Sequence, residues 1–114
     1  MSQTSDSVPT EPIALADAAA FEDHVAEHDV VLVDFYADWC GPCQMMEPAV
    51  ESVAADTDAA VLKVDVDRFQ ALAGEYDVQG IPTLLVFADE ELADRMVGAQ
   101  TEDHLRGVVE DHLA

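Results

Sequence analysis

Apolar runs alternate with polar, helix-like segments along most of this chain. Residues 30 to 36 form a near-continuous apolar run, which is typical of a strand buried on both faces of a parallel sheet. Residues 60 to 66 alternate apolar and polar side chains and predict a second strand. Residues 83 to 88 and 92 to 97 predict an antiparallel hairpin, although the turn between them lacks glycine, and a short edge strand is expected at 13 to 15. These strands predict one mixed β-sheet.

Four segments carry the helical pattern, in which apolar side chains recur every three or four residues. They begin near Asp17, at Cys40, near Asp67 and near Thr101, and the last two residues can each cap the helix that follows. Pro48 falls inside the second helix and is expected to kink it, because it removes one backbone hydrogen bond. Helices that alternate with the strands of a mixed sheet predict an α/β sandwich.

The length of 114 residues and a hydrophobic fraction of 50% suit one domain with one modest core. Residues 1 to 12 are rich in Ser, Thr and Pro, so we expect a flexible leader there and a domain over residues 13 to 114. The first ten residues lack the basic and apolar parts of a signal peptide, and no segment approaches the roughly 20 apolar residues of a membrane span. We therefore expect a cytoplasmic monomer with no membrane partner.

The chain is strongly acidic. Against 25 Asp and Glu stand four Lys and Arg, which gives a formal net charge of −21. This charge would repel the phosphates of nucleic acids, so nucleic acid binding is excluded. The carboxylates are spread along the chain instead of forming one block. Their distribution suggests a surface adapted to molar salt, as in extreme halophiles, and the alternative is an acidic face for one basic partner.

Cys40 and Cys43 are the only cysteines, and they lie three residues apart at the expected start of a helix. Residues at this spacing are about 5 to 6 Å apart at Cβ, so a disulfide can close between them. A structural bridge across so short a loop would constrain the unfolded chain little. A zinc site needs four ligands, and the four histidines lie on charged stretches where we expect them to face water. The pair therefore predicts redox chemistry.

A thiolate attacks a disulfide, and the N-terminus of a helix stabilises such an anion. Cys40 lies at that end and is the expected nucleophile, whereas Cys43, one turn deeper, is the expected resolving thiol. Gly41 permits a tight turn, and Pro42 suits the first helical turn, where its missing N–H would be unpaired anyway.

Asp34 interrupts the apolar run of the expected central strand. Burial of a lone carboxylate is costly, so its pKa should be raised. Carboxyl groups of this kind cluster at functional sites, and a purely structural buried Asp is the alternative.

The segment 33 to 43, Val-Asp-Phe-Tyr-Ala-Asp-Trp-Cys-Gly-Pro-Cys, closely resembles the active-site segment of thioredoxins. The segment 80 to 83, Gly-Ile-Pro-Thr, resembles the loop that carries the cis-proline of that family. The resemblance runs from about Leu15 to the C-terminus, and the further matching residues are Pro48, Lys63 and Gly98. It implies the thioredoxin fold, a mixed central β-sheet flanked by helices on both faces.

The resemblance also implies roles for particular residues. Asp34 would accept the proton of Cys43, and Lys63 would approach this aspartate, with a solvated strand lysine as the alternative. A cis bond between Ile81 and Pro82 would place the Ile81 backbone beside Cys40, where it can pair with an extended substrate segment. The expected substrate groove comprises Trp39, Gly41, Pro42, Ile81, Pro82 and Gly98, and for Trp39 simple core packing is the alternative.

By resemblance, a motif with Gly-Pro between the cysteines favours a protein-disulfide reductase that needs no metal and no bound cofactor. The family implies regeneration by a thioredoxin reductase, and targets of the peroxiredoxin, methionine sulfoxide reductase or ribonucleotide reductase type. Two other functions remain open. One is a disulfide oxidase or isomerase, and the other is a non-enzymatic module that binds metal through its two soft thiolates.

Overall fold

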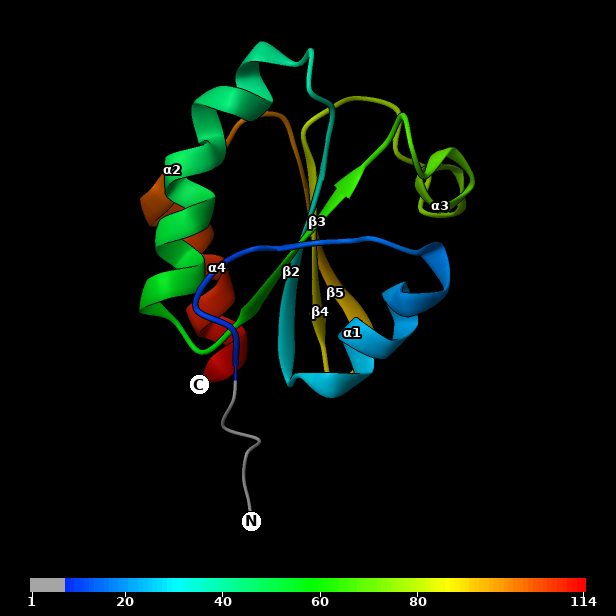
Figure 1. Ribbon diagram of the computed structural model, residues 1–114. Coiled ribbons are helices and arrows are strands. Elements are labelled where there is room, and N and C mark those ends of the chain that lie inside the picture. The colour runs from blue at the N-terminus through cyan, green and yellow to red at the C-terminus, as the bar shows by residue number, and fades with distance from the viewer. Residues whose placement is uncertain (1–7) are drawn as a thin grey trace.

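The computed structural model describes residues 8 to 114, which form a five-stranded sheet with the order β1-β3-β2-β4-β5 (Figure 1). β1 and β2 run parallel to β3, whereas β4 is antiparallel to both β2 and β5. The predicted mixed sheet is confirmed, and the strand ends agree to within one residue. The strands are β1 (Ile13–Ala14), β2 (Val30–Tyr36), β3 (Ala60–Asp65), β4 (Thr83–Ala88) and β5 (Glu91–Val97).

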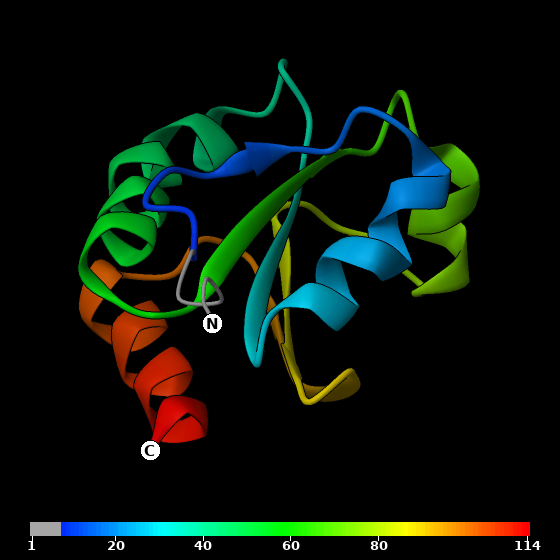
Figure 2. The same cartoon turned by 60° about the horizontal axis from the view of Figure 1, so that its bottom comes forward.

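Helices cover both faces of the sheet, as Figures 1 and 2 show from two directions. On one face lie α2 (Gly41–Asp56) and α4 (Glu102–Leu113). On the other lie α1 (Phe21–Glu27), preceded by the short 3-10 helix η1 (Ala18–Ala20), and α3 (Gln70–Glu75). α2 continues through Pro48 as one helix. The expected α/β sandwich is confirmed.

The central strand β2 is buried on both faces because each face meets a different layer of helices. Val31, Val33 and Phe35 belong to the core cluster that includes side chains of α1 and α3. Val30 and Leu32 belong to the cluster formed with α2 and α4. Side chains of a strand alternate between its faces, so residue 34 lies on the α2 side of the sheet.

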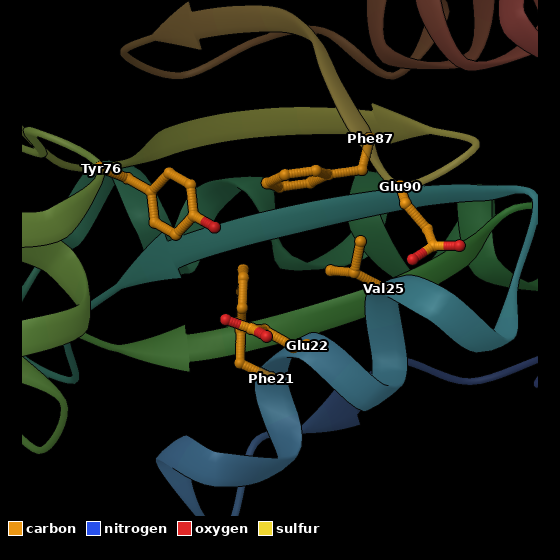
Figure 3. Close-up of a pocket in the computed structure, with 6 residues that line it drawn as sticks. All are labelled: Phe21, Glu22, Val25, Tyr76, Phe87 and Glu90. Atoms are coloured by element: carbon orange, nitrogen blue, oxygen red, sulfur yellow. The ribbon is translucent and has the colours of Figure 1, made fainter.

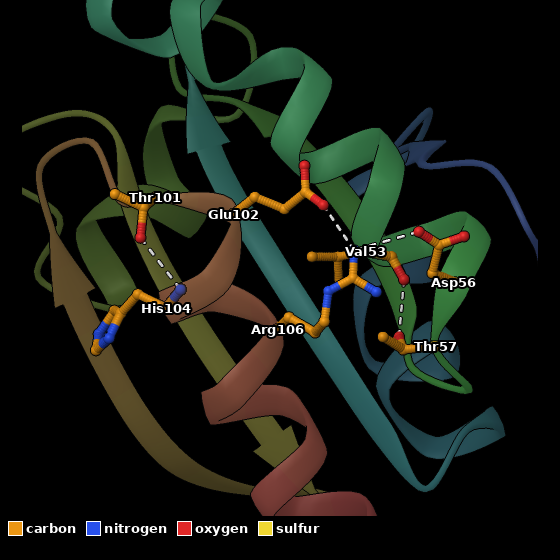
Figure 4. Close-up of polar contacts among 7 residues, drawn as sticks. All are labelled: Val53, Asp56, Thr57, Thr101, Glu102, His104 and Arg106. Carbon is orange, nitrogen blue, oxygen red and sulfur yellow. Dashed lines mark hydrogen bonds and ion pairs between the residues drawn. The ribbon is translucent and has the colours of Figure 1, made fainter.

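One of the two predicted caps is confirmed and the other is wrong. The Thr101 hydroxyl accepts a hydrogen bond of 3.1 Å from the backbone N–H of His104 and caps α4 (Figure 4). Asp67 does not cap α3, whose N-terminal position is held by Phe69 without a side-chain cap. The backbone N–H of Phe69 donates instead to the carbonyl oxygen of Asp65 at 2.9 Å. This turn delays the start of the helix and leaves the Asp67 carboxylate free for another partner.

Arg106 links α4 to α2. Its Nη2 lies 2.6 Å from Oε2 of Glu102 in the same helix and 3.2 Å from Oδ2 of Asp56 at the end of α2 (Figure 4). Ion pairs of exposed side chains contribute about 0 to 1 kcal/mol each. The pair with Asp56 connects the two helices that cover the Asp34 face of the sheet.

The hairpin between β4 and β5 closes without glycine. Asp89 and Glu90 adopt φ angles of 51° and 72°, in the left-handed region. Asp is tolerated there better than most residues, whereas Glu has no such advantage. The Asp89 N–H donates to the carbonyl oxygen of Asp29 at 2.8 Å, which fixes the turn beside the start of β2. A tertiary contact thus helps to stabilise a hairpin turn whose geometry could not be predicted from the sequence, because it lacks glycine.

The leader predicted at residues 1 to 12 is described only from Val8, and residues 1 to 7 lie outside the described part. Val8 is half-buried and packs against the cluster that includes α1 and α3.

Candidate active site

The two cysteines lie at the start of α2, just beyond the end of β2. Cys40 precedes the first helical residue in an extended conformation, with φ of −88° and ψ of 108°, and Cys43 lies in the first turn. A disulfide joins them, and their Cα atoms are 5.3 Å apart. This separation is ordinary for a disulfide. The spacing therefore permits the bridge that the sequence predicted.

The sulfur of Cys40 occupies the N-cap position of α2. It accepts a hydrogen bond of 3.2 Å from the backbone N–H of Cys43, a role that a Ser or Asp oxygen fills at many other helices. The carbonyl oxygen of Cys40 accepts the first helical hydrogen bond, from Gln44 N–H at 3.1 Å. Free N–H groups and the helix dipole both stabilise negative charge at this position. A thiolate is thus better supported at Cys40 than one turn deeper.

Both sulfur-bearing residues are largely buried, with 4% of Cys40 and 2% of Cys43 exposed. They pack against an apolar collar that consists of Ala37, Tyr36, Val66 and Ile81. Only a small part of the disulfide is therefore exposed, at the rim of this collar.

The loop before β4 forms one side of that rim. The expected cis bond between Ile81 and Pro82 is present, and the Ile81 carbonyl oxygen lies 3.9 Å from Cys40 Sγ. Gly98 N–H donates to the carbonyl oxygen of Pro82 at 2.8 Å. The φ angle of Gly98 is 91°, which favours glycine. Two segments distant in sequence thus meet beside the sulfur of Cys40.

Trp39 is not a core residue, because 69% of it is exposed. Its Nε1 donates to Oδ2 of Asp67 at 2.8 Å, so the indole is held at the surface next to Cys40. Gly41 and Pro42 are exposed as well. Sequence analysis assigned Asp67 to a helix cap and missed this contact. The residues next to Asp67 in the sequence do not show whether its carboxylate caps the following helix or binds a side chain of another loop.

Asp34 lies beneath α2 and is 2% exposed. Its Oδ1 has no hydrogen-bond partner. Burial raises the pKa of this carboxyl from 3.8 to about 7, the Lys63 ammonium opposes the rise, and the Glu47 carboxylate adds to it. The expectation of a raised pKa is confirmed.

Lys63 lies directly opposite Asp34 in the register between β2 and β3. Its ammonium is 4.4 Å from the centroid of the Tyr36 ring and forms an ion pair with Glu47. Lys63 is therefore not a solvated strand lysine. Sequence analysis missed Glu47, and the available signal was its position four residues after Cys43, on the same side of α2.

The histidines do not assemble a metal site. Within residues 8 to 114, no group of three or more His, Cys, Asp or Glu side chains is arranged to hold a metal ion. The expectation that all four histidines face water is wrong for His24, whose Nδ1 is buried. His112 is partly exposed, and its Nε2 lies 2.7 Å from Oδ2 of Asp94.

A pocket of about 230 Å³ between α1 and the hairpin lies elsewhere on the molecule (Figure 3). Three of its aromatic side chains contact one another, with ring centroids 5.5 to 6.0 Å apart. The pocket lies near the start of β2, which pairs with the end of β4, whereas the cysteines follow the end of β2. It is therefore separate from the dithiol. The lining residues are Phe21, Glu22, Val25, Tyr76, Phe87 and Glu90.

The sheet has helices on both faces, and at the N-terminus of one helix it carries two cysteines that can form a disulfide. A cis-proline loop lies beside them. Together these features define a thiol-disulfide oxidoreductase. The family model for thioredoxin matches residues 12–111. The chain belongs to the thioredoxin family, and its activity is protein-disulfide reduction through Cys40 and Cys43.

Individual relatives agree with this assignment. Thioredoxin from Staphylococcus saprophyticus is 46% identical over 95 residues, which cover 82% of this chain and 90% of that protein. The structure of a mutant thioredoxin from Halobacterium salinarum NRC-1 is 51% identical, with a TM-score of 0.91, and the match covers 95% of this chain and 96% of that one. A third match comes from a structure on thiol resolution in yeast mitochondrial 1-Cys peroxiredoxin via glutathione/thioredoxin systems, with 31% identity, a TM-score of 0.80, and coverage of 92% and 99%.

Proposed function

We propose that Cys40 attacks the substrate disulfide, that Cys43 resolves the resulting mixed disulfide, and that Asp34 accepts the proton of Cys43. The order of attack is supported by the hydrogen bond from the Cys43 N–H to the sulfur of Cys40. Of the two sulfurs, only that of Cys40 therefore receives the stabilisation that the helix N-terminus gives to a negative charge. The burial of Asp34 and its pKa of about 7 suit a group that exchanges a proton near neutral pH.

In the first step the Cys40 thiolate bonds to one substrate sulfur, and the other substrate sulfur leaves as a thiolate that takes a proton. Cys43 then gives its proton to Asp34 and attacks the sulfur of Cys40. The Cys40–Cys43 disulfide forms as the bond between Cys40 and the substrate breaks. The second substrate sulfur leaves as a thiolate and takes a proton from water, to which Asp34 returns the proton of Cys43. Two electrons and two protons pass from the dithiol to the substrate.

The proposed substrate groove is formed by Trp39, Gly41, Pro42, Ile81, Pro82 and Gly98. Its support is the position of the Ile81 carbonyl oxygen, 3.9 Å from Cys40 Sγ. A backbone group at this place can pair with an extended substrate segment, as an added strand does at a sheet edge. Lys63 would adjust the proton affinity of Asp34 from the neighbouring strand.

Thioredoxins act with thioredoxin reductase and with disulfide-containing targets. For this chain we propose a peroxiredoxin, a methionine sulfoxide reductase or ribonucleotide reductase as the target, and the peroxiredoxin class draws support from the yeast system named above. We further propose that the protein is a cytoplasmic monomer. Among residues 8 to 114, no helix has the length and apolar character that crossing a membrane requires.

The reductase activity is measured by insulin reduction with dithiothreitol as the electron source. We expect the protein to accelerate the reaction, and we expect a zinc titration of the reduced protein to show only weak binding, because two ligands make half of a tetrahedral site. The reduction potential of the pair then separates a reductase from an oxidase or isomerase. Tight zinc binding with no acceleration would favour the metal-binding module instead.

The protein is also proposed to work in concentrated salt. Its formal net charge is −21, and within residues 8 to 114 the ion pairs of Lys and Arg engage only Glu47, Asp56 and Glu102. Most carboxylates therefore repel one another, unless salt screens them. The similarity to a thioredoxin of Halobacterium salinarum at 51% identity supports this proposal.

We expect the melting temperature to rise by about 10 °C between dilute buffer and molar KCl, which corresponds to ~2 kcal/mol for a domain of this size. The reason is that the screening length falls from about 30 Å at 0.01 M salt to about 3 Å at 1 M. The same screening should ease the formation of the Cys40 thiolate, measured as a shift of thiol alkylation to lower pH. A thioredoxin of low net charge is the control, and equal responses of the two proteins would contradict the salt adaptation.

A further inference from the structure

Glu47 is linked to the active site by its ion pair with Lys63. The side chain of Glu47 is 35% exposed and that of Lys63 is 15% exposed, so the ion pair extends from the protein surface into the space beneath α2. Within the described residues this is the only ion pair of Lys63. The Tyr36 ring, 4.4 Å from Nζ, covers the ammonium on another side.

Asp34 has no such partner, although Lys63 is its neighbour in the sheet. The two residues pair in the register between β2 and β3, yet Oδ1 of Asp34 stays without a hydrogen bond. On the other side β4 presents Leu84, which is buried and apolar. The charged groups that act on the carboxyl are the Lys63 ammonium from β3 and the Glu47 carboxylate from α2. Tyr36 lies two residues further along β2, on the same face of the strand.

We infer that Glu47 is a positioning residue for proton transfer at Asp34, because it holds the Lys63 ammonium in an ion pair and so keeps it from binding the Asp34 carboxyl. This inference deepens the proposed function and rests on the role of Asp34 as proton acceptor. An ammonium released from Glu47 would be free to approach the buried carboxyl of Asp34, which lies opposite Lys63 in the register between β2 and β3. It would stabilise the carboxylate and weaken its affinity for the proton of Cys43.

The test is a titration of the Asp34 carboxyl by carbon NMR in the oxidised protein, with Glu47→Gln compared with the wild type. We expect the midpoint to fall from about 7 by about one unit in the variant. Above pH 8 Asp34 is ionised in both proteins, and they differ only in that the Asp34 carboxylate of the variant is the weaker base. Resolution of the mixed disulfide should therefore be about twofold to threefold slower in the variant.

Glu51→Gln, one turn later on the exposed side of α2, is the matched control for the loss of one negative charge and should leave the midpoint in place. Lys63→Gln tests whether Glu47 acts through the Lys63 ammonium. In the Lys63→Gln background, the shift of the Asp34 midpoint caused by Glu47→Gln should shrink to less than half. Glu47→Ala replaces Glu47→Gln if the amide disturbs folding, which thermal melting reports.

An unchanged midpoint in Glu47→Gln overturns the inference, and so does an equal shift in Glu51→Gln. An undiminished effect in the Lys63→Gln background overturns it as well, since Glu47 would then act directly. The titration needs no substrate, so it is independent of the proposed catalytic role. Failure of that role would appear separately, as a resolution rate that Asp34→Asn does not change.

Discussion

Cys40→Ser is expected to reduce protein-disulfide reduction to the uncatalysed rate, whereas Cys43→Ser should retain the attack and accumulate mixed disulfides with substrate proteins. Only the Cys40 sulfur receives a backbone N–H at the start of α2, so only this position supports the attacking thiolate. Without Cys43, no second thiol is available in the chain to release the bound substrate. The measurements are insulin reduction and the trapping of target proteins, followed by mass spectrometry.

Met45→Ser is the control for these variants, because it places a serine on the same helix at a residue that is 82% exposed. It should keep full activity. Trapping by Cys40→Ser in place of Cys43→Ser would reverse the assignment of nucleophile and resolving thiol.

Asp34→Asn is expected to slow resolution of the mixed disulfide at neutral pH and to remove a large pH dependence of stability. The folded carboxyl has a pKa of about 7, against 3.8 for the ordinary group, so the folded state binds a proton more tightly than the unfolded state. The resulting stabilisation is fully present below pH 4 and is lost as the pH rises to about 7. The shift corresponds to a change of about 4 kcal/mol in the free energy of unfolding.

Urea unfolding at pH 4 and at pH 8 measures this change. Relative to wild type, Asp34→Asn should be more stable at pH 8 than at pH 4, because the amide never ionises. Asp58→Asn makes the same replacement at an exposed residue and should follow the wild type at both pH values. Parallel behaviour of Asp34→Asn and wild type would show that the buried carboxyl does not titrate between these values. An unchanged resolution rate would leave Asp34 with a structural role alone.

The sequence by itself determined the elements and the reactive pair. The apolar run of β2, the alternation in β3 and the cap at Thr101 are all specified within a few residues, because side-chain periods and cap hydrogen bonds are local. The spacing of Cys40 and Cys43 on a first helical turn likewise permits a disulfide whatever the rest of the chain does. Burial of Asp34 followed from its place in a run of apolar residues.

Other features were decided by tertiary structure alone. Asp67 bonds to Trp39, and Glu47 pairs with Lys63, because β3 aligns with β2 and α2 lies across both strands. Such contacts depend on register and on helix placement, which no local pattern encodes. The cis bond before Pro82 is a similar case: local energetics favour trans, and the expectation of a cis bond came only from family resemblance. The local pattern therefore supplied the two thiols, while the packing of distant segments supplied the groups that surround them.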